Sequence, residues 1–145
     1  MQDKIERVIT INASKERVYE MITNPEKVVL WFPDSIEGVY KVVGHPVFVF
    51  KGHGKAQVHV IEAKPYEYFS YRWIPGSSVF VGDTSTEGTT LVEFKIEEQQ
   101  PGICTVTLTE SGFTNISADH AEKAFKQNSG GWDFMLARLG KQFSK

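Results

Sequence analysis

The sequence contains one cysteine, Cys104, among 145 residues. An internal disulfide is therefore excluded, and such scarcity is typical of proteins from reducing compartments. No cationic residue adjoins Cys104, so we interpret its thiol as a small packed apolar group. No stretch approaches the roughly 20 apolar residues of a membrane span, and the N-terminal segment lacks a signal-peptide core. We therefore expect a cytoplasmic protein with no membrane span.

The sequence also lacks a strong excess of charge of either sign. It has 16 lysines and arginines against 18 acidic residues, and the two kinds are interspersed. No basic stripe is available for a phosphate backbone, so we expect no nucleic-acid partner. The hydrophobic fraction of 41% supports one core, and no linker-like composition interrupts it. Residues 1–145 are expected to form a single domain.

Motifs of well-known catalytic and cofactor sites are missing as well. We find no nucleophile elbow, no P-loop and no dinucleotide fingerprint. The four histidines are not spaced as metal ligands on one helix or strand. We therefore expect no metal and no cofactor, and leave open only that two histidines meet in space.

The N-terminal part of the chain predicts a strand and two short helices. Residues 5–12 are rich in β-branched side chains that alternate, which favours a strand. Ser14 is a plausible N-cap for a helix that Asn24 and Pro25 end. Pro25 suits the first turn of a second helix, expected over residues 25–32 and ended by Pro33.

Beyond residue 36 the apolar pattern changes to a period of two, which predicts a meander of antiparallel strands. In this sheet one face packs and the other faces water. The long connection over residues 75–89 is interpreted as a lid over a cavity mouth or as an irregular excursion. The expected strands lie near residues 36–43, 46–51, 55–63, 67–74, 90–97 and 103–110.

A long amphipathic helix is predicted at the C-terminal end, and it contains an anomaly. Its apolar stripe continues through Ser129, Gly130 and Gly131, although each helix-interior glycine costs about 1 kcal/mol relative to alanine. Either the missing side chains leave a cavity under the sheet, or the glycines permit close backbone approach or a kink. The stripe consists of Phe125, Ser129, Trp132, Leu136, Leu139 and Phe143.

Several local motifs, taken in order, resemble the activator of heat-shock protein 90 ATPase homologue family, within the START-like or Bet v allergen-like superfamily (SRPBCC). The stretch INASKERVYEMITNPEKVVLWF is similar to the opening of that family. Further similar positions are the run KPYEYFSYRW, the Ser111-Gly112-Phe113 step and the Gly131-Trp132 pair. The matched positions of the opening are Ile11, Ala13, Val18, Tyr19, Thr23, Pro25, Glu26, Trp31 and Phe32.

This resemblance implies an α+β helix-grip (START-like) fold. In it a curved antiparallel sheet wraps around a long C-terminal helix, two short helices follow the first strand, and an apolar cavity lies between helix and sheet. Relatives bind lipids or flavonoid- or polyketide-like molecules, or act on polyketides, and the family name comes from a co-chaperone. A small hydrophobic molecule is therefore the expected partner, a chaperone is the alternative, and the chain is expected to be a monomer or a homodimer.

The candidate site combines aromatic side chains with one carboxylate. Strand parity places Glu110 toward the cavity. There it would accept a hydrogen bond from a ligand hydroxyl, pair with an arginine or histidine, act as an acid or base if burial raised its pKa, or sit at a wet strand end. The expected ligand-binding residues are Trp31, Phe32, Phe48, Phe50, Tyr71, Trp73, Phe94, Glu110, Gly131, Trp132 and Leu136.

Three functional hypotheses follow from these observations. The first is a non-enzymatic protein that binds a small hydrophobic or aromatic ligand in the cavity. The second is a polyketide cyclase- or hydrolase-like enzyme in which Glu110 is the one candidate catalytic residue. The third is a co-chaperone-like module that stimulates a chaperone ATPase through its surface.

Overall fold

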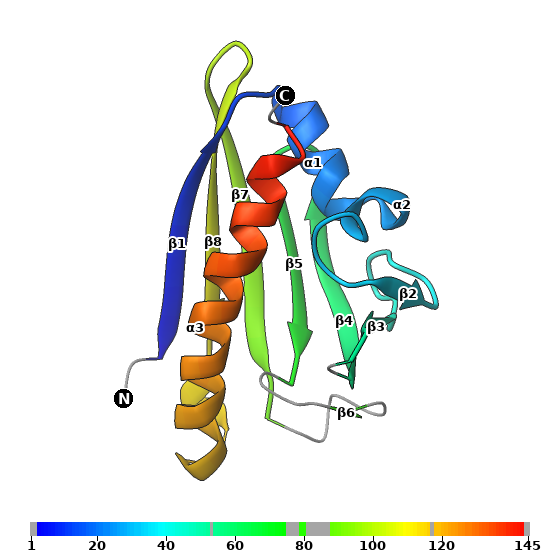
Figure 1. Cartoon of the computed structure of the whole chain (residues 1–145), viewed down its shortest axis with the longest axis vertical. Helices are drawn as coiled ribbons and strands as arrows, with labels where there is room; N and C mark the ends of the chain where they lie inside the picture. The colour runs from blue at the N-terminus through cyan, green and yellow to red at the C-terminus, as the bar shows by residue number, and fades with distance from the viewer. Residues whose placement is uncertain (1–2, 53, 75–78, 81–87, 117, 144–145) are drawn as a thin grey trace.

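An antiparallel sheet packed against one long helix, α3, organises the chain (Figure 1). The computed structural model describes residues 3–52, 54–74, 79–80, 88–116 and 118–143. In chain order the elements are β1 (Lys4–Ile11), α1 (Lys15–Thr23), α2 (Pro25–Val28), β2 (Ser35–Glu37), β3 (Val47–Phe50), β4 (Gly54–Lys64), β5 (Tyr68–Trp73), β6 (Val79–Phe80), β7 (Thr90–Gln100), β8 (Ile103–Ser111), the 3-10 helix η1 (Phe113–Asn115) and α3 (Ala118–Lys141).

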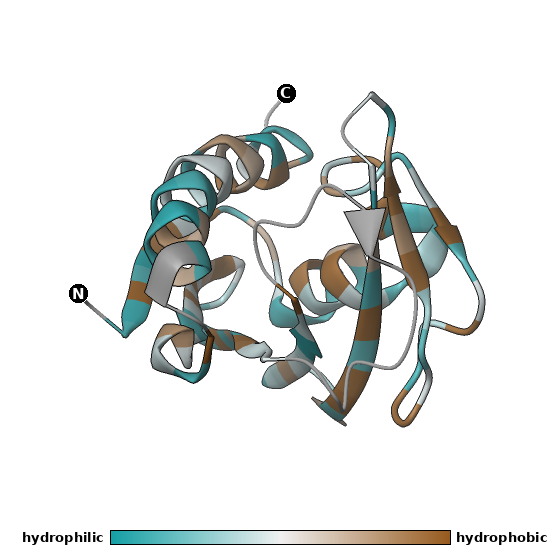
Figure 2. Ribbon diagram, turned by 90° about the horizontal axis from the view of Figure 1, so that it is seen from below, coloured by the Kyte–Doolittle hydropathy of each residue, from teal (hydrophilic) through white to brown (hydrophobic). Residues whose placement is uncertain are grey.

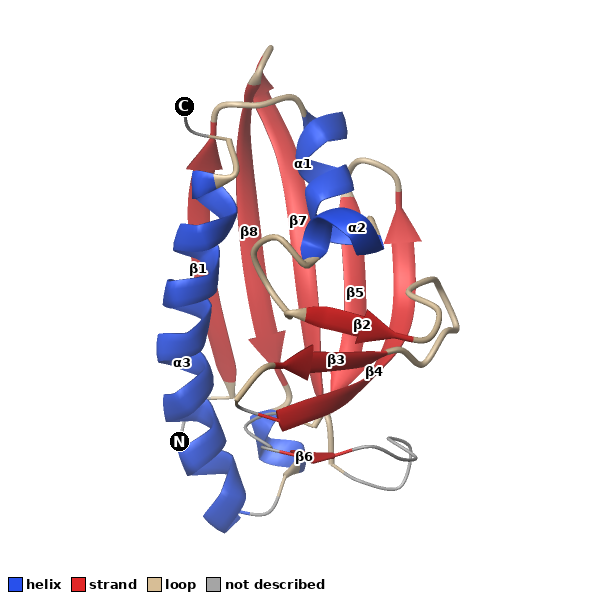
Figure 3. Ribbon diagram, turned by 45° about the vertical axis from the view of Figure 1, so that its right-hand side comes forward, coloured by secondary structure: helices blue, strands red, loops and turns tan. Residues whose placement is uncertain are grey.

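The strands follow the order β1-β8-β7-β5-β4-β3-β2, with every neighbouring pair antiparallel. Strand β6 pairs with β4 in the parallel sense. Strand β4 is shared, because Gly54–Gln57 pair with β3 whereas Val58–Lys64 pair with β5. A register shift between Val60 and Glu62 adds an irregularity, of the kind that increases local twist. Helix α3 runs along the β1 side, and β2 and β3 stand at the opposite side (Figure 3).

Capping residues set the boundaries of the first two helices. The Ser14 hydroxyl accepts a hydrogen bond from the Arg17 N–H at 3.3 Å, as an N-cap should. Asn24 ends α1 and also caps α2, because its side-chain oxygen accepts from the Glu26 N–H at 2.8 Å. Pro25 occupies the first turn of α2, where its missing N–H costs nothing.

Two expected elements are shorter than the sequence pattern suggested. The strand expected near residues 36–43 is limited to Ser35–Glu37, because Gly38 takes φ +92° and Val43 takes φ +61°, values that leave the extended region. The second helix ends at Val28 instead of residue 32. Beyond it the backbone continues in tighter turns, with the Leu30 N–H bonded to the Lys27 carbonyl.

The alternation of apolar residues along the strands is confirmed. Phe69, Tyr71 and Trp73 of β5 are all buried on the face that meets the helices. Figure 2 shows hydrophobic and hydrophilic residues alternating along the sheet. The inner face carries most of the core, joined by the buried α3 residues Trp132, Leu136 and Leu139.

Only part of the connection expected as a lid or an excursion can be described. Residues 75–78 and 81–87 lie outside the described residues, so that interpretation stays a prediction. Within the described ranges, no helix combines the length and apolarity that crossing a bilayer requires.

Two buried tyrosines differ in how their hydroxyls are satisfied. The Tyr40 hydroxyl donates to the Ile22 carbonyl at 2.8 Å and so ties the segment after β2 to α1. The Tyr71 hydroxyl is fully enclosed and has no hydrogen-bond partner among the described residues. Burial is the main cause that raises the pKa of both phenols above the ordinary value.

We expect Tyr71→Phe to leave the free energy of unfolding unchanged or to raise it by about 1 kcal/mol, because it removes a buried polar group without a partner. Tyr40→Phe should lower it by about 1 kcal/mol, because the Ile22 carbonyl loses its donor. Urea denaturation followed by circular dichroism measures both variants. If Tyr71→Phe lost more unfolding free energy than Tyr40→Phe, the conclusion that, of these two hydroxyls, only that of Tyr40 is hydrogen-bonded among the described residues would be contradicted.

The same tyrosines predict how stability depends on alkaline pH. Burial and the hydrogen bond with Glu93 raise the pKa of Tyr68 to about 12, and the pKa values of Tyr40 and Tyr71 are also raised. Groups with a raised folded-state pKa contribute stability that is complete below about pH 10 and lost as the pH rises further. The urea concentration at the midpoint of unfolding should therefore decrease as the pH is raised from about 10 to about 12. A midpoint that stays constant over this pH range would be inconsistent with this prediction.

Candidate functional site

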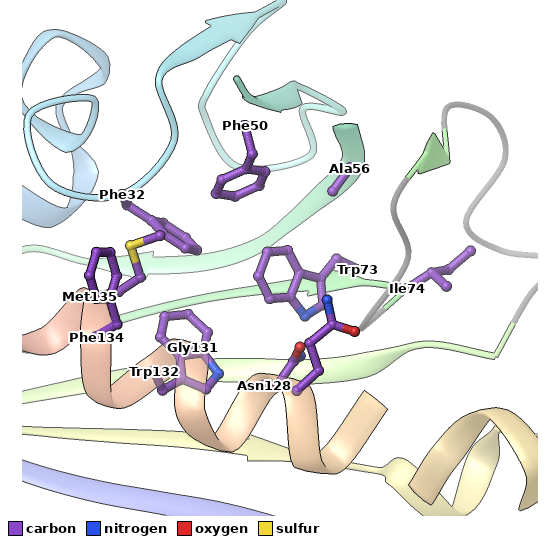
Figure 4. Close-up of a pocket in the computed structure, with 11 residues that line it drawn as sticks. Phe32, Phe50, Ala56, Trp73, Ile74, Asn128, Gly131, Trp132, Phe134 and Met135 are labelled. Atoms are coloured by element: carbon purple, nitrogen blue, oxygen red, sulfur yellow. The ribbon is translucent and has the colours of Figure 1, made fainter. Parts of the chain in front are cut away.

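A pocket of about 400 Å³ lies between α3 and the side of the sheet formed by β3, β4 and β5 (Figure 4). Its size falls in the range of roughly 300–1,000 Å³ that small-molecule sites occupy. None of the described residues that line it carries a charge. They are Phe32, Phe50, Ala56, Trp73, Ile74, Gln127, Asn128, Gly131, Trp132, Phe134 and Met135.

Helical spacing explains one wall of this pocket. Asn128, Gly131, Trp132 and Met135 recur at intervals of three and four residues, which places them on one face of α3. The opposite wall comes from Phe50 and from the β4 and β5 strands, while residue 32 closes the space after α2. The pocket is thus built from segments that are distant in sequence.

Aromatic rings dominate the interior of the pocket. The rings of Trp73 and Trp132 lie 5.9 Å apart at 31°. Phe32 stands between the two walls, with its ring centroid 5.2 Å from Trp132 and 5.5 Å from Phe50. Such rings offer apolar faces against which a flat ligand can stack.

The two glycines of α3 can now be interpreted. The helix runs without interruption through both, and a Cβ atom built on either would meet nothing within 4 Å. Close backbone approach therefore does not account for them. Gly131 is exposed and lines the pocket whereas Gly130 does not line it, so the missing side chain at Gly131 leaves space open on the pocket side of the helix.

Behind the wall lies Glu110, a fully buried carboxylate on β8. From the sheet, the Trp73 Nε1–H donates to its Oε2 atom at 2.9 Å, and the Thr90 hydroxyl donates to the same oxygen at 2.5 Å. Trp73 and Thr90 face each other in the β5–β7 ladder, and Glu110 pairs with Val92 in the β7–β8 ladder. Three adjacent strands therefore converge on one carboxylate.

Helix α3 supplies the remaining donors to Glu110. The Trp132 Nε1–H donates to Oε1 at 2.8 Å, and the Asn128 amide nitrogen lies 3.0 Å from Oε1 and 3.1 Å from Oε2. Asn128 and Trp132 are one helical turn apart, so both reach the same group. Buried carboxylates are costly unless they are hydrogen-bonded, and these donors satisfy that requirement without a cation.

Glu110 forms no ion pair among the described residues, and every donor to it is neutral. It does not line the pocket itself. Instead, Trp73, Asn128 and Trp132 form the wall and point their N–H groups away from the pocket toward the carboxylate. Glu110 thus fixes the orientation of the side chains that a ligand would contact.

The structure brings together part of the expected binding set. Phe32, Phe50, Trp73, Gly131 and Trp132 line the pocket. The remaining residues lie in the core or behind the wall. They are Trp31, Phe48, Tyr71, Phe94, Glu110 and Leu136.

Strand parity could not separate these two groups, because the inner face of the sheet both lines the pocket and packs on the short helices. Trp31, for example, donates its Nε1–H to the Met21 carbonyl at 2.9 Å. Six pocket residues were not predicted from the sequence: Ala56, Ile74, Gln127, Asn128, Phe134 and Met135. A sequence signal existed for two of them: Asn128 is one helical turn before Trp132, and Phe134 is an aromatic residue that lies off the apolar stripe of the helix.

Two histidines do meet in space, a possibility that the sequence left open. The His45 and His59 rings stack 4.2 Å apart at 18°. Burial lowers the pKa of His59, and the nearby His45 and Arg72 lower it further. No group of three or more potential metal ligands occurs in the part of the chain that the structure describes.

Comparisons with known proteins agree with this architecture. Residues 12–144 match the family model described as activator of Hsp90 ATPase homolog 1-like protein. No curated protein matches the sequence.

Solved structures with a similar fold share little sequence with this chain. The Aha1 dimer from Colwellia psychrerythraea is 20% identical, with a TM-score of 0.77 over 98% of this chain and 96% of that one. MLL2253 from Mesorhizobium loti is 17% identical, with a TM-score of 0.77 over 95% and 94%. DynU16, from the dynemicin biosynthetic locus, is 19% identical, with a TM-score of 0.75 over 97% of this chain. The present chain spans 47% of DynU16.

The hydrogen bonds of Glu110 lead to a prediction for Glu110→Gln. A glutamine amide has one acceptor oxygen, so its nitrogen must face at least one of the donors Trp73, Trp132 and Thr90. We expect a loss of about 1–3 kcal/mol in the free energy of unfolding, measured by urea denaturation. Glu97→Gln, on the exposed side of β7, removes the same charge and should change stability by less than about 0.5 kcal/mol. If Glu110→Gln and Glu97→Gln lowered the free energy of unfolding equally, the hydrogen bonds to Glu110 would not be the source of the stabilisation.

Proposed function

The chain belongs to the activator of Hsp90 ATPase homolog 1-like family, and we propose that it binds a small apolar, aromatic molecule in the pocket between α3 and the sheet. The observation that carries this proposal is Gly131, a glycine inside a long helix whose absent side chain opens onto the pocket. A helix accepts such a residue at a cost of about 1 kcal/mol. We explain the presence of this destabilising residue by the space that it leaves for a ligand.

The composition of the walls favours an aromatic ligand. Burying roughly 200 Å² of apolar surface would contribute about 5 kcal/mol before the costs of association. Stacking on Trp73 or Trp132 would add about 0.5–1.5 kcal/mol, because aromatic pairs gain more than their buried area. The pocket is large enough for two or three fused rings, and Phe134, one of the residues that line it, is exposed.

Context from structural relatives is compatible with this proposal. DynU16 comes from a biosynthetic locus, and the Colwellia protein was solved as a dimer. For the present chain we propose the small-molecule role, with a homodimer compatible with it.

An acid or base role for Glu110 receives less support from the geometry. Its two oxygens already accept from four side chains, and it stands behind the wall instead of facing the pocket. A substrate would have to displace Asn128 or an indole to reach it. We therefore favour a binding protein over the cyclase- or hydrolase-like alternative.

The pocket proposal predicts opposite outcomes for two neighbouring glycines. Gly131→Leu should fill the pocket and weaken binding of the neutral dye N-phenyl-1-naphthylamine at least about tenfold. Gly130→Leu should bind the dye as the unmodified protein does, because residue 130 does not line the pocket. Both variants should fold at least as stably as the original chain, since leucine is the better helix former.

Dye fluorescence titrations measure the affinities, and thermal unfolding measures the folding of each variant. Unchanged dye affinity in a folded Gly131→Leu protein would overturn the proposal. An equal loss of dye affinity in Gly130→Leu would also overturn the proposal, because residue 130 does not line the pocket.

A further inference from the structure

We propose that the pocket selects its ligand by charge: it takes a neutral or cationic aromatic molecule that carries a hydrogen-bond donor, and it rejects a carboxylate. This inference rests on the proposed function, since it names the chemical class of the ligand at that same site. It follows from two features of the wall, the buried charge behind it and the orientation of one amide.

The charge comes from Glu110. Its side chain has no exposed surface, all its hydrogen-bond donors are neutral, and no ion pair involves it among the described residues. Both indoles can only donate, so Glu110 must accept at both oxygens. Four neutral donors around one carboxyl group favour its charged form, so we take Glu110 as an ionised carboxylate whose charge is stabilised by hydrogen bonds but not neutralised.

A single layer of side chains separates the Glu110 carboxylate from the pocket. This layer consists of Trp73, Asn128 and Trp132, which line the pocket and also donate to Glu110. Glu110 and the two indoles in front of it are buried, so screening by solvent is weak. A unit charge on a ligand beyond this single layer of side chains would change the binding constant by about tenfold or more, favouring cations and opposing anions.

Arg138 is a cation close to the pocket wall. The Arg138 guanidinium lies 5.9 Å from the ring centroid of Phe134, a pocket residue. Arg138 is only half-buried, so water and salt reach it and weaken its field. We therefore expect the enclosed carboxylate, and not this arginine, to set the preference of the interior.

The second feature is the amide of Asn128. Its nitrogen must face Glu110, since a carboxylate accepts but cannot donate. The amide oxygen is consequently turned away from Glu110, in a residue that lines the pocket and is only partly buried. A ligand hydroxyl or amine can donate to that oxygen, whereas a carboxylate would face it with a second acceptor.

Four naphthalene probes with one common ring system test the inference. They are 2-naphthylmethylamine (a cation), 2-naphthalenemethanol (a neutral donor), 2-(methoxymethyl)naphthalene (neutral, without a donor) and 2-naphthoate (an anion). Isothermal titration at about pH 7 and constant salt should rank the amine at least as tight as the alcohol. The ether should bind several-fold more weakly than the alcohol, and the acid at least about tenfold more weakly.

Two variants identify the source of the preference. In Glu110→Gln the ratio of amine to acid affinity should fall about tenfold or more, because the charge is gone. Arg138→Gln should keep the order of the probes. If Glu110→Gln does not fold, the order measured on the unmodified protein decides alone.

The outcomes separate this inference from the proposed function. Binding of 2-naphthoate as tight as the amine would overturn the charge selection and leave the ligand-binding pocket standing. Equal binding of the ether and the alcohol would overturn the role of the Asn128 oxygen. Absence of binding by every probe and by N-phenyl-1-naphthylamine would overturn both proposals.

Discussion

The carboxylate of Glu110 and its neutral donors form the interaction on which the rest of the architecture depends. Donors from β5, β7 and α3 meet one acceptor on β8, so a single buried group joins the sheet to the helix that crosses it. Each partner needs the others: the carboxylate would be costly without donors, and two buried indole N–H groups would be costly without an acceptor. This mutual dependence fixes the position of α3 over the sheet more specifically than apolar contact does.

The pocket is a consequence of that arrangement. When Trp73 and Trp132 turn their N–H edges toward Glu110, their rings become walls, and Gly131 leaves the volume beside them open. The site therefore combines a rigid polar anchor, which no ligand needs to touch, with an apolar surface that a ligand can touch. Affinity would come from the surface, and selectivity from the charge behind it.

Much of the fold could be predicted from the sequence, because strand alternation, the helical stripe and the family resemblance all report on local or repeated patterns. The sequence-based predictions were incomplete where tertiary contacts determine the end of an element or the partners of a side chain. Backbone angles at Gly38 and Val43 end β2 early, although the alternation continues. Parity placed Glu110 on the inner face but could not identify its partners, because Trp73, Thr90 and Trp132 are distant in sequence. Nor could it distinguish Phe48, which is in the core, from Phe50, which lines the pocket.

The most direct test of the account observes the indole N–H groups of the three tryptophans by ¹H–¹⁵N NMR while N-phenyl-1-naphthylamine is added. Trp73 and Trp132 line the pocket, whereas Trp31 bonds to the Met21 carbonyl outside it and serves as an internal reference. The account predicts that the signals of Trp73 and Trp132 shift together on binding and that the Trp31 signal shifts least. A dominant shift of Trp31, or binding that moves none of the three signals, would contradict it.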